Sequence, residues 1–126
     1  MKIIISYPPL SREKGCPTLG QNRQFQYFKE PTLIYPVVPA TAATMLKQAG
    51  YEVVWNDSLA KDWNYAAFLD FIRMEQPDLI VFETKTPVIK EYWEIINDIN
   101  KMFPDDNAPG IVYLGTMLQP SRKNHF

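Results

Sequence analysis

The sequence predicts an α/β fold in which an open parallel sheet of about four strands is covered by helices on both faces. The first observation is that short apolar segments alternate with amphipathic helical segments, which is typical of βαβ units. The second is that Asp78–Phe82 is apolar almost throughout, as a central strand between two helical layers should be. The third is size: 126 residues, 46% of them hydrophobic, suffice for one domain with a sizeable core.

Four segments carry the strand signal. They are Lys2–Ser6, Tyr51–Trp55, Asp78–Phe82 and Ile111–Leu114. An open sheet of this kind normally continues with another crossover and another strand. Residues 117–126 show neither strand nor helix periodicity instead. We therefore expect one α/β domain over residues 1–116, whose last strand is missing, followed by a tail over residues 117–126 that looks non-native.

Three helices are expected between these strands, over about Ala40–Ala49, Asn64–Glu75 and Pro87–Met102. Each has apolar residues at helical spacing on one face. Gly50 is placed to end the first helix in the left-handed conformation. Thr86 is a suitable N-cap for the third helix, because a proline follows it at a first-turn position.

A long loop joins the first strand to the first helix. Loops of this length are uncommon in compact domains and are usually functional or disordered. This one is rich in aromatic residues, which disfavours disorder; they are Phe25, Tyr27, Phe28 and Tyr35. In an open α/β sheet, such a loop lies at the carboxyl end of the strand, where ligands bind. The aromatic side chains either pack the loop onto the sheet or form an apolar platform for a large flat ligand.

Composition excludes several classes of function. The formal net charge is -1, so there is no electrostatic footprint for nucleic acid. No apolar run reaches the length of a membrane span and the N-terminus has no signal-peptide pattern, so the expected compartment is the cytoplasm. Gly15 and Gly20 form neither a Walker loop nor a dinucleotide fingerprint. A nucleophilic Cys16 would need His125 to fold back from the tail, which makes a small hydrolase or transferase the weakest alternative.

Two carboxylates follow strands, Asp57 after the second and Glu83 after the third. Because the carboxyl ends of parallel strands share one edge of the sheet, the two side chains could face one crevice. The alternative is that they are solvated or cap a helix. Glu83 and Thr86 would then both serve the N-terminus of the third helix, whose dipole favours an anion or a polar ligand group.

The order of several short motifs resembles a known family. Tyr7-Pro8-Pro9-Leu10 follows the first strand, Pro39-Ala40-Thr41 opens the first helix, and Gly50-Tyr51-Glu52-Val53 leads into the second strand. Together with residues 78–87, these motifs resemble the N-terminal cobalamin (B12)-binding domain of B12-binding radical SAM proteins. The similarity spans roughly the first 115 residues and rests on order and spacing, since each motif alone is weak.

The resemblance implies a flavodoxin-like (Rossmann-like) sheet that holds a corrin ring against the carboxyl ends of its strands. The residues that would shape this rim are Tyr7, Pro8, Pro9, Glu83, Thr84, Thr86 and Gly115. The first loop has no histidine to bind cobalt, and the chain lacks the three-cysteine motif of a [4Fe-4S] cluster. We therefore expect cobalamin as cofactor, no iron–sulfur cluster, no catalysis by this chain alone, and a radical SAM domain as partner in the parent protein. The alternative is a stand-alone α/β module that binds a protein and no cofactor.

The tail supports a more specific hypothesis. The family commonly continues after its fourth strand with a Gly-Asp-His-Val-Thr-Ala-Leu-Pro-Glu-Glu type segment. One choice of synonymous codons for Gly115 to Phe126, read from its third base, encodes Asp-His-Val-Thr-Ala-Leu-Pro-Glu-Glu-Ser-Phe. We therefore expect that one base was lost near the codons for Gly115-Thr116. Reduced cobalamin affinity and self-association through an exposed sheet edge are the expected consequences.

Overall fold

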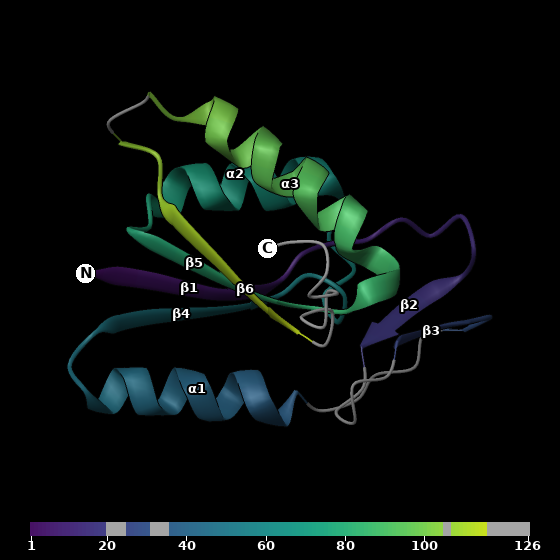
Figure 1. Cartoon of the computed structure of the whole chain (residues 1–126), viewed down its shortest axis with the longest axis horizontal. Helices are drawn as coiled ribbons and strands as arrows, with labels where there is room; N and C mark the ends of the chain where they lie inside the picture. Colours follow the sequence, from purple (N-terminus) through teal and green to yellow (C-terminus); the bar gives the residue numbers. More distant parts are fainter. Residues whose placement is uncertain (20–24, 31–35, 105–106, 116–126) are drawn as a thin grey trace, which may run out of the picture.

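The computed structural model describes residues 1–19, 25–30, 36–104 and 107–115, and in this part of the chain the main sheet has four parallel strands (Figure 1). The strands are β1 (Lys2–Tyr7), β4 (Glu52–Asp57), β5 (Leu79–Thr84) and β6 (Gly110–Gly115). Their order is β4-β1-β5-β6, and all three pairings are parallel. The predicted open parallel α/β sheet of about four strands is therefore confirmed.

Helices cover both faces of this sheet, also as predicted. The helix α1 (Val37–Gln48) lies on one face, and α2 (Tyr65–Glu75) and α3 (Ile89–Met102) lie side by side on the other (Figure 1). The core cluster is on the α2/α3 side, where Phe68, Phe82 and Tyr92 are fully buried. The Phe82 and Tyr92 rings pack edge to face, with centroids 5.7 Å apart, so they fix α3 against the central strand.

The ends of the helices confirm some predicted signals and correct one. The Asn64 side chain accepts a hydrogen bond from the Ala67 N–H and caps α2, and Gly50 follows α1 at φ +101°. The prediction that Thr86 is the N-cap of the third helix is wrong. Residues Thr86–Val88 form a short 3₁₀ turn (η1), and α3 begins only at Ile89, with Val88 as its N-cap and no side-chain cap.

The first loop contains secondary structure that was not predicted. The strands β2 (Cys16–Leu19) and β3 (Phe25–Phe28) form an antiparallel pair. This pair lies beyond the carboxyl ends of the main strands, at the end of the molecule where α3 begins (Figure 1). Gly15 permits the turn into β2: its φ is +125°, and a Cβ atom there would lie 2.7 Å from the Phe28 carbonyl oxygen. Tyr35 falls outside the described residues.

The two faces of the sheet are covered unequally. The helix α1 contacts β4 and β1, and it leaves the same face of the other two strands less covered. Burial along β5 therefore alternates: Ile80 and Phe82 are fully buried, and Val81 is only half-buried. On β6, Val112 is 43% exposed. The expectation that the third strand is apolar and covered on both faces thus holds fully only for the α2/α3 face.

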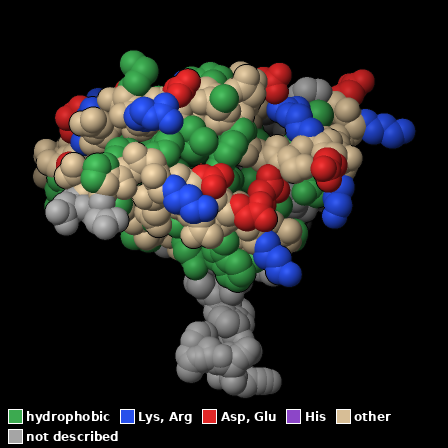
Figure 2. All heavy atoms as spheres, turned by 90° about the horizontal axis from the view of Figure 1, so that it is seen from above, with side chains coloured by type: hydrophobic (Ala, Val, Ile, Leu, Met, Phe, Trp, Pro, Cys, Tyr) green, Lys and Arg blue, Asp and Glu red, His purple; other side chains and the backbone are tan. Residues whose placement is uncertain are grey.

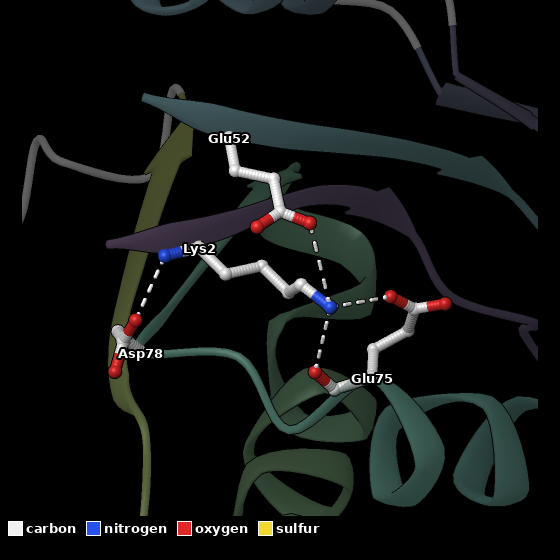
Figure 3. A network of polar contacts seen from close by, with 4 residues as sticks. All are labelled: Lys2, Glu52, Glu75 and Asp78. Carbon is white, nitrogen blue, oxygen red and sulfur yellow. Dashed lines mark hydrogen bonds and ion pairs between the residues drawn. The ribbon is translucent and has the colours of Figure 1, made fainter. Parts of the chain in front are cut away.

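The amino ends of the strands are joined by one lysine (Figure 3). The Lys2 ammonium lies 3.0 Å from Glu75 Oε1 and 3.6 Å from Glu52 Oε2, and it also donates to the Glu75 carbonyl oxygen at the end of α2. The Lys2 backbone N–H donates to Asp78 Oδ2 at 2.7 Å. The side-chain hydrogen bond to Glu75 is the main cause that raises the pKa of Lys2. One residue therefore ties together β1, β4 and the chain between α2 and β5.

Candidate functional site

The order of the strands places a switch point between β1 and β5. The chain passes from β1 outward to β4, returns across the sheet to β5, and continues outward to β6. In open α/β sheets, ligands bind at the carboxyl ends of the two strands where the direction of winding reverses. Tyr7 ends β1 and Thr84 ends β5, so the predicted site residues of these strands stand at this point.

Tyr7 and Glu83 meet across the switch point. The Tyr7 hydroxyl donates a hydrogen bond to Glu83 Oε1, and the Lys85 ammonium lies 3.8 Å from Glu83 Oε2. Tyr7 and Lys85 are both buried, 5% and 3% exposed. Burial, and then the hydrogen bond to Glu83, raise the pKa of Tyr7 far above its ordinary value. The phenol therefore stays protonated and serves as a fixed hydrogen-bond donor to the carboxylate.

Thr84 and Tyr92 hold the end of β5 against α3. The Tyr92 hydroxyl donates to the Glu83 carbonyl oxygen at 2.7 Å, and Tyr92 is fully buried. Thr84 is fully buried as well. Burial raises the pKa of the Tyr92 phenol, and the Thr84 hydroxyl beside it lowers this pKa in part, although it makes no hydrogen bond of good geometry in the described part of the chain.

A second polar group lies where β1 and β4 pair. Ser6 and Ser58 both donate to Asn56 Oδ1, at 2.8 and 2.9 Å, and all three residues are buried. Asn56 Nδ2 has no partner among the described residues. Beside this group, Asp57 Oδ1 accepts from the Ala60 N–H at 3.0 Å, and burial raises the pKa of Asp57. The carboxyl ends of three adjacent strands thus carry polar side chains inside the protein.

The other predicted site residues lie around the same rim. Pro8 is buried and Pro9 half-buried directly after β1. Gly115 pairs with Thr84 in the register of β5 and β6. Thr86 lies in η1, two residues beyond β5, and its side chain is outside the described part of the structure. The structure therefore brings Tyr7 and Glu83 into contact and places the remaining predicted residues at the same end of the sheet.

Sequence reasoning missed three residues of this arrangement: Lys85, Tyr92 and Asn56. Lysine is seldom buried, so its residue type gives no reason to expect Lys85 inside the protein. Tyr92 has the helical spacing of a core residue, which accounts for the burial of its ring but not for the hydrogen bond of its hydroxyl. The only signal for Asn56 in the sequence is its position directly after the predicted strand Tyr51–Trp55 and directly before Asp57.

A cavity of about 590 Å³ opens beside the rim, on the face covered by α2 and α3. Its walls are residues 9–12 after β1, residues 58, 59 and 62–65 around the start of α2, and one side of α3. Figure 2 views this face, on which hydrophobic side chains are visible between carboxylates. The cavity has a volume typical of small-molecule sites.

The described residues hold no group of three or more His, Cys, Asp or Glu side chains that could bind a metal ion. Within the same residues, no helix has the length and apolar character needed to cross a membrane. Comparison with protein-family models, with curated proteins and with solved structures gives no match to this chain.

Proposed function

We propose that this chain is a cobalamin-binding domain that is not catalytic alone and acts with a radical SAM domain in its parent protein. The observation that carries the proposal is the contact between Tyr7 and Glu83 at the switch point of the sheet. Together with the motif order, this geometry supports a ligand that lies across the carboxyl ends of β1 and β5.

The chemistry of the rim fits a corrin. A corrin is a large flat ring with amide side chains, so it needs hydrogen-bond donors and acceptors beside apolar surface. Glu83 offers a carboxylate that is 16% exposed, and one of its oxygens accepts from the Tyr7 hydroxyl. Pro9, which is half-buried, supplies apolar surface at the same rim. The corrin would supply the metal chemistry, and this chain would bind and orient it.

Spectroscopic titration with hydroxocobalamin tests the proposal. We expect saturable binding that is weakened by Tyr7→Phe, which removes the hydrogen bond at the switch point, and by Glu83→Gln, which keeps an acceptor oxygen but removes the negative charge. Tyr51→Phe is the matched control, since Tyr51 is exposed and lies at the other end of β4. Replacing residues 116–126 by Asp-His-Val-Thr-Ala-Leu-Pro-Glu-Glu should tighten binding. The absence of binding in both the wild-type and the replaced chain would contradict the proposal.

The alternative is a stand-alone α/β module that binds a protein and no cofactor. The encoding DNA separates the two proposals. Sequencing from the Leu114 codon through several hundred bases past the stop should show the Asp-His-Val-Thr-Ala-Leu-Pro-Glu-Glu reading frame, followed by a three-cysteine motif. A single open frame with no such alternative would favour the stand-alone module.

The edge of the sheet supports a second proposal about assembly. In the described residues β6 pairs only with β5, and Val112 and Tyr113 on it are exposed. An exposed edge strand with apolar residues is a template for pairing with another chain. We expect the chain to self-associate through β6, and light scattering coupled to size exclusion would measure the mass. Val112→Lys should return the chain to a monomer; a wild-type monomer at all concentrations would contradict this assembly.

A further inference from the structure

The cavity between α3 and the loops after β1 and β4 has an uneven charge. Its lining includes four carboxylates, Asp62, Glu91, Glu94 and Asp98, and one cationic side chain, Arg12. Arg12 is already paired, because its guanidinium lies 2.7 Å from Asp62 Oδ1. Three carboxylates on one side of α3 therefore face the cavity without a cation.

Two of these three carboxylates accept hydrogen bonds from neutral donors, and the third has no partner among the described residues. Asp98 accepts from the Tyr65 hydroxyl at 2.6 Å, and Glu91 accepts from the Ser11 N–H. Glu94 has no hydrogen-bond or ion-pair partner in the described part of the chain. Neutral donors fix the orientation of a carboxylate but leave its charge uncompensated. Burial, together with the charges of Glu94 and Glu13, raises the pKa of Glu91, which agrees with an excess of negative charge.

The rest of the lining is apolar and aromatic. Leu10 is 5% and Ile95 3% exposed, and both contribute to the wall. Trp63 and Tyr65 stand at the side of α2. The Lys61 ammonium already lies 5.0 Å from the centre of the Trp63 ring, so a cation from the protein itself occupies one side of this aromatic residue. The cavity therefore combines apolar walls with a cation-binding aromatic ring and uncompensated carboxylates.

A metal ion does not fit this arrangement, because no three acidic side chains among the described residues are placed to hold one. An organic cation does fit, since its charged end can meet the carboxylates of α3 while its body contacts the apolar wall. We propose that this cavity binds a small organic cation, a primary amine or guanidinium on an apolar body. The site is separate from the contact between Tyr7 and Glu83, and it does not depend on cobalamin binding.

The test uses two probes of similar size and opposite charge, 2-phenylethylamine and 3-phenylpropionate. Binding is followed on the full chain by isothermal titration calorimetry and by amide chemical shifts. We expect the amine to bind and to shift the amides of Ser11, Trp63 and Asp98, and the carboxylate to leave them unchanged. Raising the sodium chloride concentration from 20 to about 500 mM should weaken the amine, because salt screens the carboxylates.

Two variants test the role of the carboxylates. Glu94→Gln breaks no contact in the described structure, and Asp98→Asn keeps an oxygen that can accept from Tyr65. Each should weaken the amine about fivefold, the upper range for exposed ion pairs. Asp70→Asn is the control, because Asp70 is an exposed carboxylate on α2 paired with Arg73 and is not part of the cavity. Equal binding of both probes, an unchanged amine affinity in Glu94→Gln, or no amine binding by the wild-type chain would each overturn the proposal.

Discussion

The hydroxyl of Tyr92 offers the sharpest test of how the switch point is held. Tyr92 is fully buried, its ring packs on Phe82, and its hydroxyl donates to the Glu83 carbonyl oxygen at 2.7 Å. Tyr92→Phe removes only the hydroxyl and keeps the ring contact. The change therefore isolates the hydrogen bond between α3 and the end of β5.

The expected loss follows from that one bond. A neutral hydrogen bond contributes about 1 kcal/mol to stability, and a buried carbonyl left without its partner is destabilising by about 1–3 kcal/mol. Since the removed hydroxyl itself no longer has to be buried, we expect a net loss of about 1.5 kcal/mol in the free energy of unfolding. For a domain of this size, that corresponds to a fall in Tm of roughly 6 °C.

Urea denaturation followed by circular dichroism measures this loss, from the shift in midpoint at an unchanged m-value. Tyr51→Phe is the control, because Tyr51 is exposed and should change stability by less than about 0.5 kcal/mol. If Tyr92→Phe is as stable as the wild-type protein, the hydroxyl does not hold β5 to α3. A loss of about 4 kcal/mol would instead indicate that the ring packing had collapsed.

Three further changes test other parts of the structure. Gly15→Ala should lower Tm more than Gly50→Ala does in thermal unfolding. Both glycines have positive φ, but only at Gly15 would a Cβ atom lie against a backbone oxygen, that of Phe28. An equal fall in Tm for the two variants would show that the close approach is unimportant. Asp57→Asn should raise the free energy of unfolding at pH 7, since burial raises the folded pKa of this carboxyl above 3.8 and its ionisation opposes folding at higher pH. In urea titrations the gain in stability should vanish near pH 3, where the carboxyl is protonated in both states. A gain that persists at this pH would refute this cause. Stability should fall as pH rises above 10, because burial raises the pKa of Tyr92 in the folded state and only the unfolded chain then releases its proton. In Tyr92→Phe, the slope of the free energy of unfolding against pH in this range should be less steep by about 1.4 kcal/mol per pH unit. An unchanged slope in alkaline unfolding curves would contradict the assignment.

The main sheet could be predicted because its strands are apolar runs separated by helical periodicity. In segments such as Ile3-Ile4-Ile5 every side chain is apolar and buried, and a central strand of a parallel sheet is the structure that buries successive residues on both of its faces. The start of α3 could not be predicted in this way. Val88 is 3% exposed and its N–H donates to the Lys85 carbonyl oxygen, so burying this side chain requires a tight turn before the helix. That requirement comes from tertiary packing and overrides the local preference of Thr86 for an N-cap.

The β2–β3 pair was missed because its sequence contains a signal against a strand. Pro17 lies inside β2 and has no N–H to donate, which normally excludes a residue from a sheet. In a pair of two strands each strand has an open side, so the missing donor is tolerated there. Pro17 is paired with Tyr27 in this register. Phe25, Tyr27 and Phe28 lie in β3, so this part of the loop is structured as expected, but the type of structure depends on this pairing.

The candidate site was predictable in position and only partly in contacts. Tyr7 and Glu83 were identified because both follow strands, and parallel strands end at a common edge. Their pairing depends on β1 and β5 being neighbours, which no local pattern in the sequence specifies. The partner of the Tyr92 hydroxyl is a backbone carbonyl, which no residue type marks. Cobalamin as the ligand stays a prediction from the motif order.

The Lys2 network has a consequence for how the domain opens. It joins residues that are 73 positions apart in the chain and lies at the end of the sheet opposite the switch point (Figure 3). Local opening of a protein starts where few contacts hold the segments together. Lys2 therefore fastens the amino ends of β1 and β4 to the chain between α2 and β5, and the buried contacts of Tyr7, Asn56 and Tyr92 hold the carboxyl ends. Loss of the Lys2 side chain should therefore speed amide hydrogen exchange at the amino ends of β1 and β4 more than at their carboxyl ends.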